Sequence, residues 1–321
     1  MAHEIAMING KASMAFVGDR KDIWHGLGQQ LTDNASIETW AKEAVMDWNI
    51  MESPVKYQDV LRGELKGFDE KKVLYRGDTG AALSVVGADY KVVQPSEVLE
   101  FFRDLVSLQN MKLETAGCLF GGRRFWALAN TGRVSAVGGD NVGGYLLLVT
   151  SADGTLATQA SMVATRVVCN NTLTLALSET SDNRVKISHR RVFDPTNVKQ
   201  NLGLVDQAWE KFMSNMNSLY NTKISDKAAM ETIQAIYSKD DGDISTRSKN
   251  QADKAYDLYM GNGMGSNPAK NTLWGVLNSV TEMVTHHNGA RTADSKLWSS
   301  WYGSGANLND KAYEKLLSMV D

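Results

Sequence analysis

The sequence predicts an α+β protein: an antiparallel β-meander with packed helices, followed by a helical C-terminal region. Strand-like runs separated by glycine recur over residues 48–192. The strands stop at Pro195, after which apolar residues recur at helical spacing. These changes predict three segments: an N-terminal arm over residues 1–31, an α+β core domain over 32–194 and a helical C-terminal domain over 195–321.

Composition sets broad limits on the kind of protein. A chain of 321 residues with 43% hydrophobic residues can bury a full core without covalent staples. Cys118 and Cys169 are too few for a disulfide framework, which favours a reducing compartment. The N-terminus lacks the pattern of a signal peptide, and no apolar run reaches the roughly 18 residues of a membrane span. We therefore expect a cytoplasmic protein with no membrane partner.

The N-terminal segment is predicted to be a polar arm followed by a short helix. The arm ends in Trp24-His25-Gly26, whose aromatic ring either faces a ligand or pins the arm onto the core. After the arm, Ser36 is placed to cap a helix over residues 36–45 that buries one apolar face.

Residues 48–130 alternate between strands and one helix. Glycine-punctuated runs over 48–93 predict an antiparallel meander. Pro95 opens an amphipathic helix, because proline is favoured in the first turn. Two further strands, over 113–120 and 123–130, are joined by Gly121-Gly122, which predicts a two-residue hairpin turn.

Residues 143–177 form the centre of the predicted core. An aliphatic strand over 145–150 is broken at Asp153-Gly154, a strong signal for a hairpin turn, and a return strand begins at Thr155. Asn170 or Asn171 is placed to cap a following helix. This pattern predicts a hairpin and then a helix, with Arg166 at their junction; an ordinary solvated strand end is the alternative for that arginine.

Positive charge is concentrated in the middle of the chain. Residues 121–200 hold nine Lys or Arg and five Asp or Glu, a net charge of +4, whereas the whole chain carries −3. A phosphate-backbone groove has this electrostatic footprint, and a solvated strand face is the alternative. The predicted phosphate contacts are Arg123, Arg124, Arg166, Lys186, Arg190 and Arg191, and Tyr145 or Trp126 is the predicted stacking surface for bases.

The region after Pro195 has the pattern of a series of helices. A long amphipathic helix covers residues 202–219, a second covers 226–237 with Ser225 as its cap, and a third lies around 251–260. A glycine-rich break ends the third helix. A fourth helix covers 272–287 and a final one covers 308–320.

No motif indicates an enzyme. The chain contains no His-Glu-x-x-His, no Cys-x-x-Cys and no Gly-x-Ser-x-Gly. His286 and His287 are adjacent on a helix and point about 100° apart, which does not suit one metal ion. His25, His189 and His286 could converge in space, although their spacing does not predict it. We assign no catalytic residue, no metal site and no cofactor.

Several segments carry a resemblance to a known family. They are Trp24-His25-Gly26-Leu27-Gly28, Asp89-Tyr90-Lys91-Val92-Val93-Gln94-Pro95, the hairpin at Asp153-Gly154, Arg166-Val167-Val168-Cys169-Asn170-Asn171-Thr172-Leu173, the helix with Trp274, Asn278, Glu282 and His286, and Trp301-Tyr302-Gly303-Ser304-Gly305. Together they resemble the prophage- and plasmid-borne "phage/plasmid-like protein" family, a domain of unknown function. The resemblance implies a phage or mobile-element setting. More remotely, the order of elements is similar to that of phage single-strand annealing recombinases, which assemble as rings or helices and hold single-stranded DNA in a basic groove.

The leading hypothesis is a non-enzymatic homo-oligomer that binds and anneals single-stranded DNA during recombination. Annealing requires cations that neutralise phosphates while the bases stay available to a complementary strand. The alternative is a phage-encoded antagonist that binds a host defence protein or nuclease, which the slight net negative charge favours. A third hypothesis is a hydrolase built on Cys169 or on clustered histidines.

Overall fold

The computed structural model describes residues 7–8, 10–18, 28–108, 111–166, 171–174, 185–194, 196, 205–239, 242–264, 269–289 and 292–320. The chain forms two compact units. The first unit comprises Met1–Thr131, Leu146–Ser161 and Arg184–Gly203, and the second comprises Gly132–Tyr145, Met162–Asn183 and Leu204–Asp321. This division differs from the predicted break at residue 195, because three strands of the middle segment contribute residues to both units.

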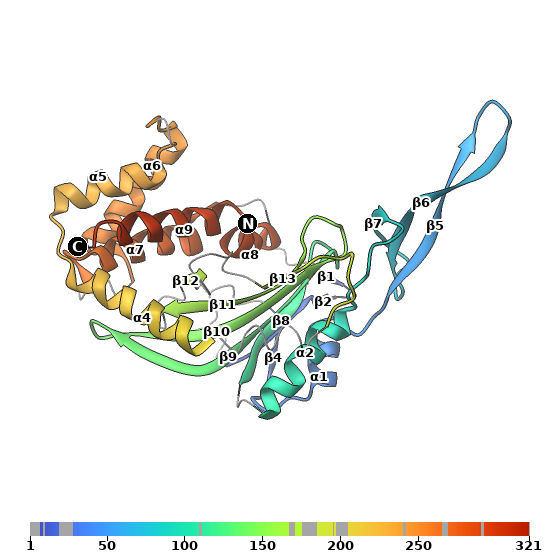
Figure 1. The fold of residues 1–321 in the computed structure, drawn as a ribbon, viewed down its shortest axis with the longest axis horizontal. Coiled ribbons are helices and arrows are strands. Elements are labelled where there is room, and N and C mark those ends of the chain that lie inside the picture. Colours follow the sequence, from blue (N-terminus) through green and yellow to red (C-terminus); the bar gives the residue numbers. More distant parts are fainter. Residues whose placement is uncertain are drawn as a thin grey trace. The chain divides into compact units, whose positions relative to one another are not determined.

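The predicted fold class is confirmed, since antiparallel sheets combine with helices and a helical region follows them. Among the described residues, the largest sheet has the strand order β12-β11-β10-β9-β8-β3-β4, with β13 paired to β11 (Figure 1). β3 is parallel to β4 and antiparallel to β8. The strands are β3 (Met14–Val17), β4 (Gln29–Leu31), β8 (Lys112–Leu119), β9 (Arg124–Val137), β10 (Asp140–Ser151), β11 (Thr158–Arg166), β12 (Asn171–Thr174) and β13 (Val185–Ile187).

The N-terminal segment is more than the predicted polar arm. A short hairpin, β1 (Met7–Ile8) with β2 (Lys11–Ala12), precedes β3. β3 lies between β8 and β4, and its Met14, Ala15 and Phe16 are fully buried. The N-terminal segment therefore contributes an apolar strand, β3, to the interior of the sheet. Trp24 and His25 lie outside the described residues.

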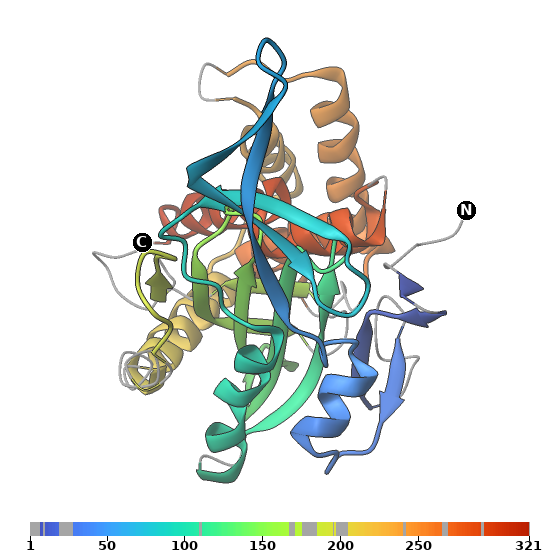
Figure 2. The same ribbon diagram turned by 90° about the vertical axis from the view of Figure 1, so that its right-hand side faces the viewer.

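Two helices of the first unit confirm the predictions made for them. α1 (Ile37–Glu43) begins after Ser36, whose hydroxyl accepts a hydrogen bond from the Thr39 N–H at 3.2 Å. α2 (Pro95–Leu108) begins at the predicted proline, and its Leu99, Phe101 and Phe102 are buried. α1 and α2 lie side by side (Figure 2).

The predicted meander is a three-stranded sheet of β5 (Ile50–Asp59), β6 (Glu64–Arg76) and β7 (Ala82–Gly87). β7 pairs with β6 only over Lys71–Tyr75, so the far half of the β5–β6 hairpin is two-stranded. We call residues 56–68 the distal arm. It is visible in Figures 1 and 2 as a projecting light-blue ribbon.

Two predictions for residues 143–177 are wrong in detail. β10 and β11 are joined by the six residues 152–157 and not by a two-residue turn, although Gly154 has the positive φ of +72° that the signal implied. The helix predicted from Asn170 or Asn171 is, over Asn171–Thr174, strand β12. It pairs antiparallel with β11, Arg166 opposite Asn171. The β-branched residues Thr172 and Thr174 fit a strand better than a helix.

Among its described residues, the second unit contains the five predicted helices and one that was not predicted, over Ala293–Tyr302. All ten residues of α7 are buried, and α4, α5, α6 and α9 contact it. The predicted cap of α5 is confirmed, because the Ser225 hydroxyl accepts from the Ala228 N–H. The helices are α4 (Val205–Asn221), α5 (Asp226–Tyr237), α6 (Thr246–Asp257), α7 (Leu273–Glu282), α8 (Ala293–Tyr302) and α9 (Ser304–Leu317), with π-helical turns η2 (Leu258–Asn262) and η4 (Met283–His287). In the described part of the chain, no helix has the length and apolar character needed to span a membrane.

Candidate functional site

Turns of the first unit gather around the connection between β10 and β11. The Ala152 N–H donates to the Arg123 carbonyl at 2.7 Å, and this hydrogen bond links the β8–β9 turn to the connection. The Nε2 atom of His189 lies 3.1 Å from the Leu156 carbonyl oxygen, and this contact links the turn after β13 to the same connection. We call residues 87–91, 120–124, 151–157 and 188–191 the turn cluster. It brings segments far apart in the sequence to one end of the sheet.

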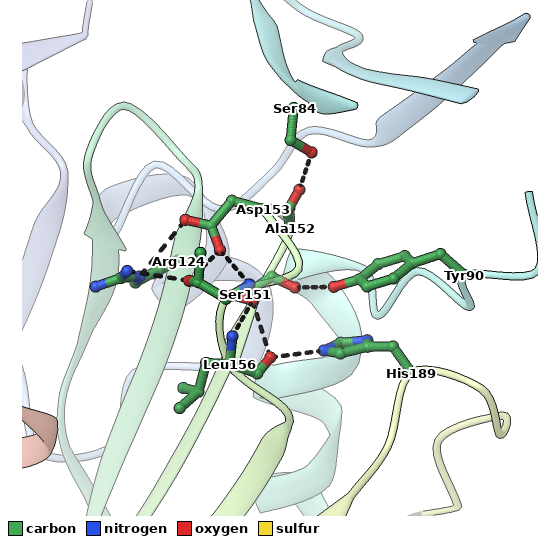
Figure 3. A network of polar contacts seen from close by, with 9 residues as sticks. Ser84, Tyr90, Arg124, Ser151, Ala152, Asp153, Leu156 and His189 are labelled. Carbon is green, nitrogen blue, oxygen red and sulfur yellow. Dashed lines mark hydrogen bonds and ion pairs between the residues drawn. The ribbon is translucent and has the colours of Figure 1, made fainter. Parts of the chain in front are cut away.

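Polar side chains within and beside the β10–β11 connection stabilise its conformation (Figure 3). Asp153 accepts from the Thr155 N–H at 3.0 Å, and its carboxylate lies 3.7 Å from the Arg124 Nε. Arg124 also donates to the Thr155 hydroxyl at 3.1 Å. Burial lowers the pKa of Arg124, and Asp153 opposes this shift. Arg124 therefore braces the connection.

Tyr90 supports the opposite side of the same connection. Its hydroxyl donates to the Ser151 carbonyl at 2.7 Å, and its ring stacks on His189 with centroids 4.4 Å apart (Figure 3). Burial raises the pKa of Tyr90 to about 12, so the phenol remains a donor at neutral pH. Ser84 adds a hydrogen bond to the Ala152 carbonyl.

His189 joins two turns through both ring nitrogens. Nδ1 lies 2.9 Å from the Lys91 carbonyl oxygen and Nε2 lies 3.1 Å from that of Leu156. A neutral imidazole has one N–H and can donate to only one of these acceptors. Burial lowers the pKa of His189, and the two carbonyls and Asp153 oppose that shift. The ring is therefore expected to be neutral and to hold one turn more strongly than the other.

This arrangement predicts a loss of stability on acidification. The folded-state pKa of His189 is below its ordinary value of about 6.5, so the unfolded chain takes up the proton first. The stabilisation is present above about pH 6.5 and is lost as pH falls through the folded-state pKa. We expect the unfolding free energy in urea to fall between pH 7 and 5, and to fall less in His189→Gln. A free energy that rises on acidification would mean that an imidazolium donates to both carbonyls.

An open cavity of about 560 Å³ lies within the turn cluster and reaches β6. Its lining includes Glu70, Asp89, Tyr90, His189 and Arg190. Charges of both signs and an aromatic pair therefore meet at one opening. In the described part of the chain, no three His, Cys, Asp or Glu side chains are grouped in a way that could hold a metal ion.

The structure separates the predicted site residues into three groups. Arg123, Arg190 and Arg191 are exposed in the turn cluster, and Lys186 is exposed on the adjacent strand β13. Arg124 is engaged with Asp153, as described above. Arg166 and Tyr145 belong to the second unit.

Trp126 has a different environment from the one predicted for a stacking surface. Its side chain is 1% exposed and belongs to the core of the first unit. A base cannot stack on a ring that is covered by the protein, so Trp126 does not fit that role. Of the histidines that could have converged, His189 belongs to the first unit and His286 to the second. His25 and Cys169 lie outside the described residues.

Sequence reasoning missed the residues that shape the turn cluster. The sequence did not predict that Ser84 and Tyr90 support the β10–β11 connection, because they lie on β7 and in the turn after it, far from Asp153 in the sequence. One local signal was available for Asp153. An aspartate side chain can accept a hydrogen bond from the backbone N–H two residues later, which forms an Asx turn, and Asp153 accepts from the Thr155 N–H in this way.

The chain's family follows from its middle and C-terminal residues. Residues 82–301 match the family described as a domain of unknown function (DUF932). The chain belongs to this family. The match begins at β7 and includes the whole turn cluster, together with α7. No curated protein and no solved structure matches the chain. The predicted link to phages and plasmids stays a prediction.

Proposed function

We propose that this DUF932 protein binds single-stranded DNA at the turn cluster and, as an oligomer, promotes annealing without covalent chemistry. One observation carries the proposal. The turn with Arg123 and the turn with Arg190 and Arg191 are both hydrogen-bonded to the β10–β11 connection. Two cationic turns from distant parts of the sequence are thereby held near each other on one scaffold.

The charge and shape of the turn cluster support binding of a single strand. Exposed guanidinium groups donate in a fixed fork to phosphate oxygens, and neutralised phosphates release counterions. The adjacent cavity has carboxylates at Glu70 and Asp89, which can accept hydrogen bonds from base amino groups. An unpaired strand exposes both N–H groups of each amino group to such carboxylates, whereas base pairing in a duplex leaves only the N–H that faces the groove. The proposal is therefore for unpaired strands.

Titration of a labelled oligonucleotide tests the proposal. Fluorescence anisotropy with a 30-nucleotide single strand, at salt from 50 to 300 mM, is expected to show binding that weakens steeply with salt. Four phosphate contacts correspond to a slope of about −3 in a plot of log affinity against log salt. A duplex of the same sequence is expected to bind more weakly. No change in anisotropy at 50 mM salt would end the proposal, and a salt-independent affinity would contradict its electrostatic basis.

The rival function, a protein antagonist of a host defence system or nuclease, requires a surface for another protein. The exposed apolar residues of the distal arm are where such a surface would lie. A pull-down from nuclease-treated host lysate separates the two functions. A stoichiometric host protein retained without nucleic acid supports the antagonist, whereas loss of all retained material after nuclease treatment supports DNA binding.

A further inference from the structure

We infer that the cavity in the turn cluster binds one unpaired nucleobase through the base's hydrogen-bond donors, and that it prefers guanine. This inference rests on the proposed function and specifies which part of a single strand enters the cavity. Three features of the cavity lead to it: an aromatic pair, two carboxylates and an arginine at the same opening.

The cavity has the size and the walls of a small-molecule site. Its volume of about 560 Å³ lies within the roughly 300–1,000 Å³ of typical ligand pockets. All its lining residues belong to the first unit. Several of them are small and leave room for a flat ring: Gly87, Ala88, Gly154, Ala157 and Ser188. The cavity can therefore accept a base together with its sugar.

The aromatic pair offers a stacking surface for that base. The Tyr90 ring stacks on the His189 ring, with centroids 4.4 Å apart and planes inclined by 15°. His189 is 8% exposed, whereas Tyr90 is half-buried, so Tyr90 is the outer ring of the pair. The Ser151 carbonyl holds the Tyr90 hydroxyl in place. A base that stacks on a ring already fixed by the protein pays little entropy for ordering the site.

Two carboxylates determine which bases suit the cavity. Glu70 and Asp89 line the same opening, and among the described residues neither side chain has an ion-pair or hydrogen-bond partner. The backbone holds both segments, because the Ala88 N–H donates to the Glu70 carbonyl and the Tyr90 N–H donates to the Gly87 carbonyl, each at 3.0 Å. An ionised carboxylate only accepts hydrogen bonds. The cavity therefore selects a base edge that donates them.

Guanine presents the edge that suits a carboxylate best. Its ring N–H and its amino group lie side by side, so they can donate to both oxygens of one carboxylate in a bidentate contact. Cytosine and adenine have an amino group next to a ring nitrogen that accepts, so they can donate only through the amino group. Thymine has a single ring N–H between two carbonyl oxygens, and the carboxylates repel those oxygens. The expected order of preference is guanine, then cytosine and adenine, then thymine.

The arginine at the opening favours a nucleotide over simpler ligands. Arg190 is exposed and lines the cavity together with Glu70 and Asp89. A simple amine would suit the carboxylates, but the guanidinium would repel it. An isolated phosphate would suit the guanidinium, but the carboxylates would repel it. A nucleotide satisfies both, because its phosphate accepts from the arginine while its base donates to a carboxylate.

Anisotropy titrations at 50 mM salt with 15-nucleotide single strands test the preference. One strand contains only thymine, and a second has a single guanine at its centre, so neither strand pairs with itself. We expect the guanine strand to bind about ten-fold more tightly, as one bidentate base contact predicts. A third strand has inosine at its centre, which keeps the ring N–H of guanine but lacks the amino group. It is expected to lose most of this gain.

The variant Glu70→Gln/Asp89→Asn tests whether the carboxylates select the base. It removes two negative charges near the bound phosphates, so the thymine strand is expected to bind more tightly to the variant than to the wild type. The preference for the guanine strand is expected to disappear. Asp33→Asn/Asp253→Asn is the matched control, because it removes two exposed carboxylates that lie outside the cavity. The control is expected to keep the ten-fold preference.

The possible failures of the two proposals are distinguishable. Equal binding of the thymine and guanine strands would overturn the base preference and leave the proposed function standing. A Glu70→Gln/Asp89→Asn variant that still prefers guanine would also overturn it. If neither strand binds at 50 mM salt, the proposed function itself fails.

Free deoxyguanosine monophosphate distinguishes a base within a strand from a free nucleotide. A single nucleotide makes few phosphate contacts, so we expect it not to displace the guanine strand below about 1 mM. Displacement at micromolar concentrations would show that the cavity binds a free guanine nucleotide, and it would overturn the strand as the ligand.

Discussion

The variant Arg123→Ala/Arg190→Ala/Arg191→Ala is expected to bind a single-stranded oligonucleotide on the order of 100-fold more weakly at 50 mM salt. All three side chains are exposed on turns that hydrogen bonds hold to the β10–β11 connection. Removing one cation that neutralises a phosphate of a single strand lowers the magnitude of the salt slope by about 0.7, so removing three lowers it by about 2. Anisotropy titrations at several salt concentrations measure both the affinity and the slope.

A second triple variant serves as the control for the effect of losing three positive charges anywhere on the protein. Lys42→Ala/Lys112→Ala/Arg247→Ala removes three exposed cations that lie outside the turn cluster. It is expected to bind within about three-fold of the wild type, because screened charges at a distance contribute little. Equal losses in the two triple variants would contradict a localised site. Arg124 is left unchanged in both variants because its side chain braces the β10–β11 connection.

The variant Arg76→Ala is expected to lose about 3 kcal/mol of unfolding free energy. Arg76 is 2% exposed and makes a bidentate pair with Asp78, at 2.9 and 2.6 Å. Its guanidinium lies 3.8 Å from the centre of the Trp48 ring and donates to the Gly121 carbonyl. Truncation removes the ion pair, the stacking and the hydrogen bond to that carbonyl at once. Arg76 also holds the pKa of Asp78 below its ordinary range through the hydrogen bonds.

Urea unfolding measures this loss, with two matched variants. Arg76→Lys keeps the charge but cannot make the bidentate contact, so an intermediate loss is expected. Arg247→Ala removes an exposed arginine and is expected to change the free energy by less than about 0.5 kcal/mol. An Arg76→Ala protein as stable as Arg247→Ala would show that the buried pair contributes nothing net.

The same buried arginine explains why Gly122 is a glycine. Its φ is +98°, and a Cβ there would lie 2.6 Å from the Trp48 ring and 2.8 Å from an Arg76 nitrogen. The sequence predicted Gly121-Gly122 as a two-residue turn. The structure instead has four residues, 120–123, between β8 and β9, and Phe120 also has a positive φ of 54°. The close approach of Arg76, which lies far away in the sequence, could not be predicted from the local pattern.

Local sequence signals predicted some elements correctly, whereas other elements could not be predicted from such signals. Ser36 and Ser225 were identified as caps because a helix start is a local hydrogen-bonding problem. The strand at Asn171 was missed because the capping signal of the asparagines was given more weight than the β-branched Thr172 and Thr174, although the partner strand β11 ends nearby, at Arg166. Helix propensity and capping signals were overridden there by sheet formation.

The candidate site was predictable only as a region of charge. Counting cations located the segment that holds Arg123 and Arg190, but it could not distinguish an exposed arginine from one engaged with a carboxylate. Arg124 and Trp126 lie close to the exposed Arg123 in the sequence, but their environments do not suit DNA contacts. Arg124 is half-buried against Asp153, and Trp126 is fully buried. Separating such residues requires the fold, because burial depends on which strands and turns pack together.

Photocrosslinking tests the central claim, that single-stranded DNA binds at the turn cluster, most directly. A single strand containing a photoreactive base is irradiated with the wild-type protein, and crosslinked peptides are identified by mass spectrometry. We expect crosslinks in residues 120–124 and 188–191, which the Arg123→Ala/Arg190→Ala/Arg191→Ala variant greatly reduces. Crosslinks confined to the second unit, or none at 50 mM salt, would contradict the account.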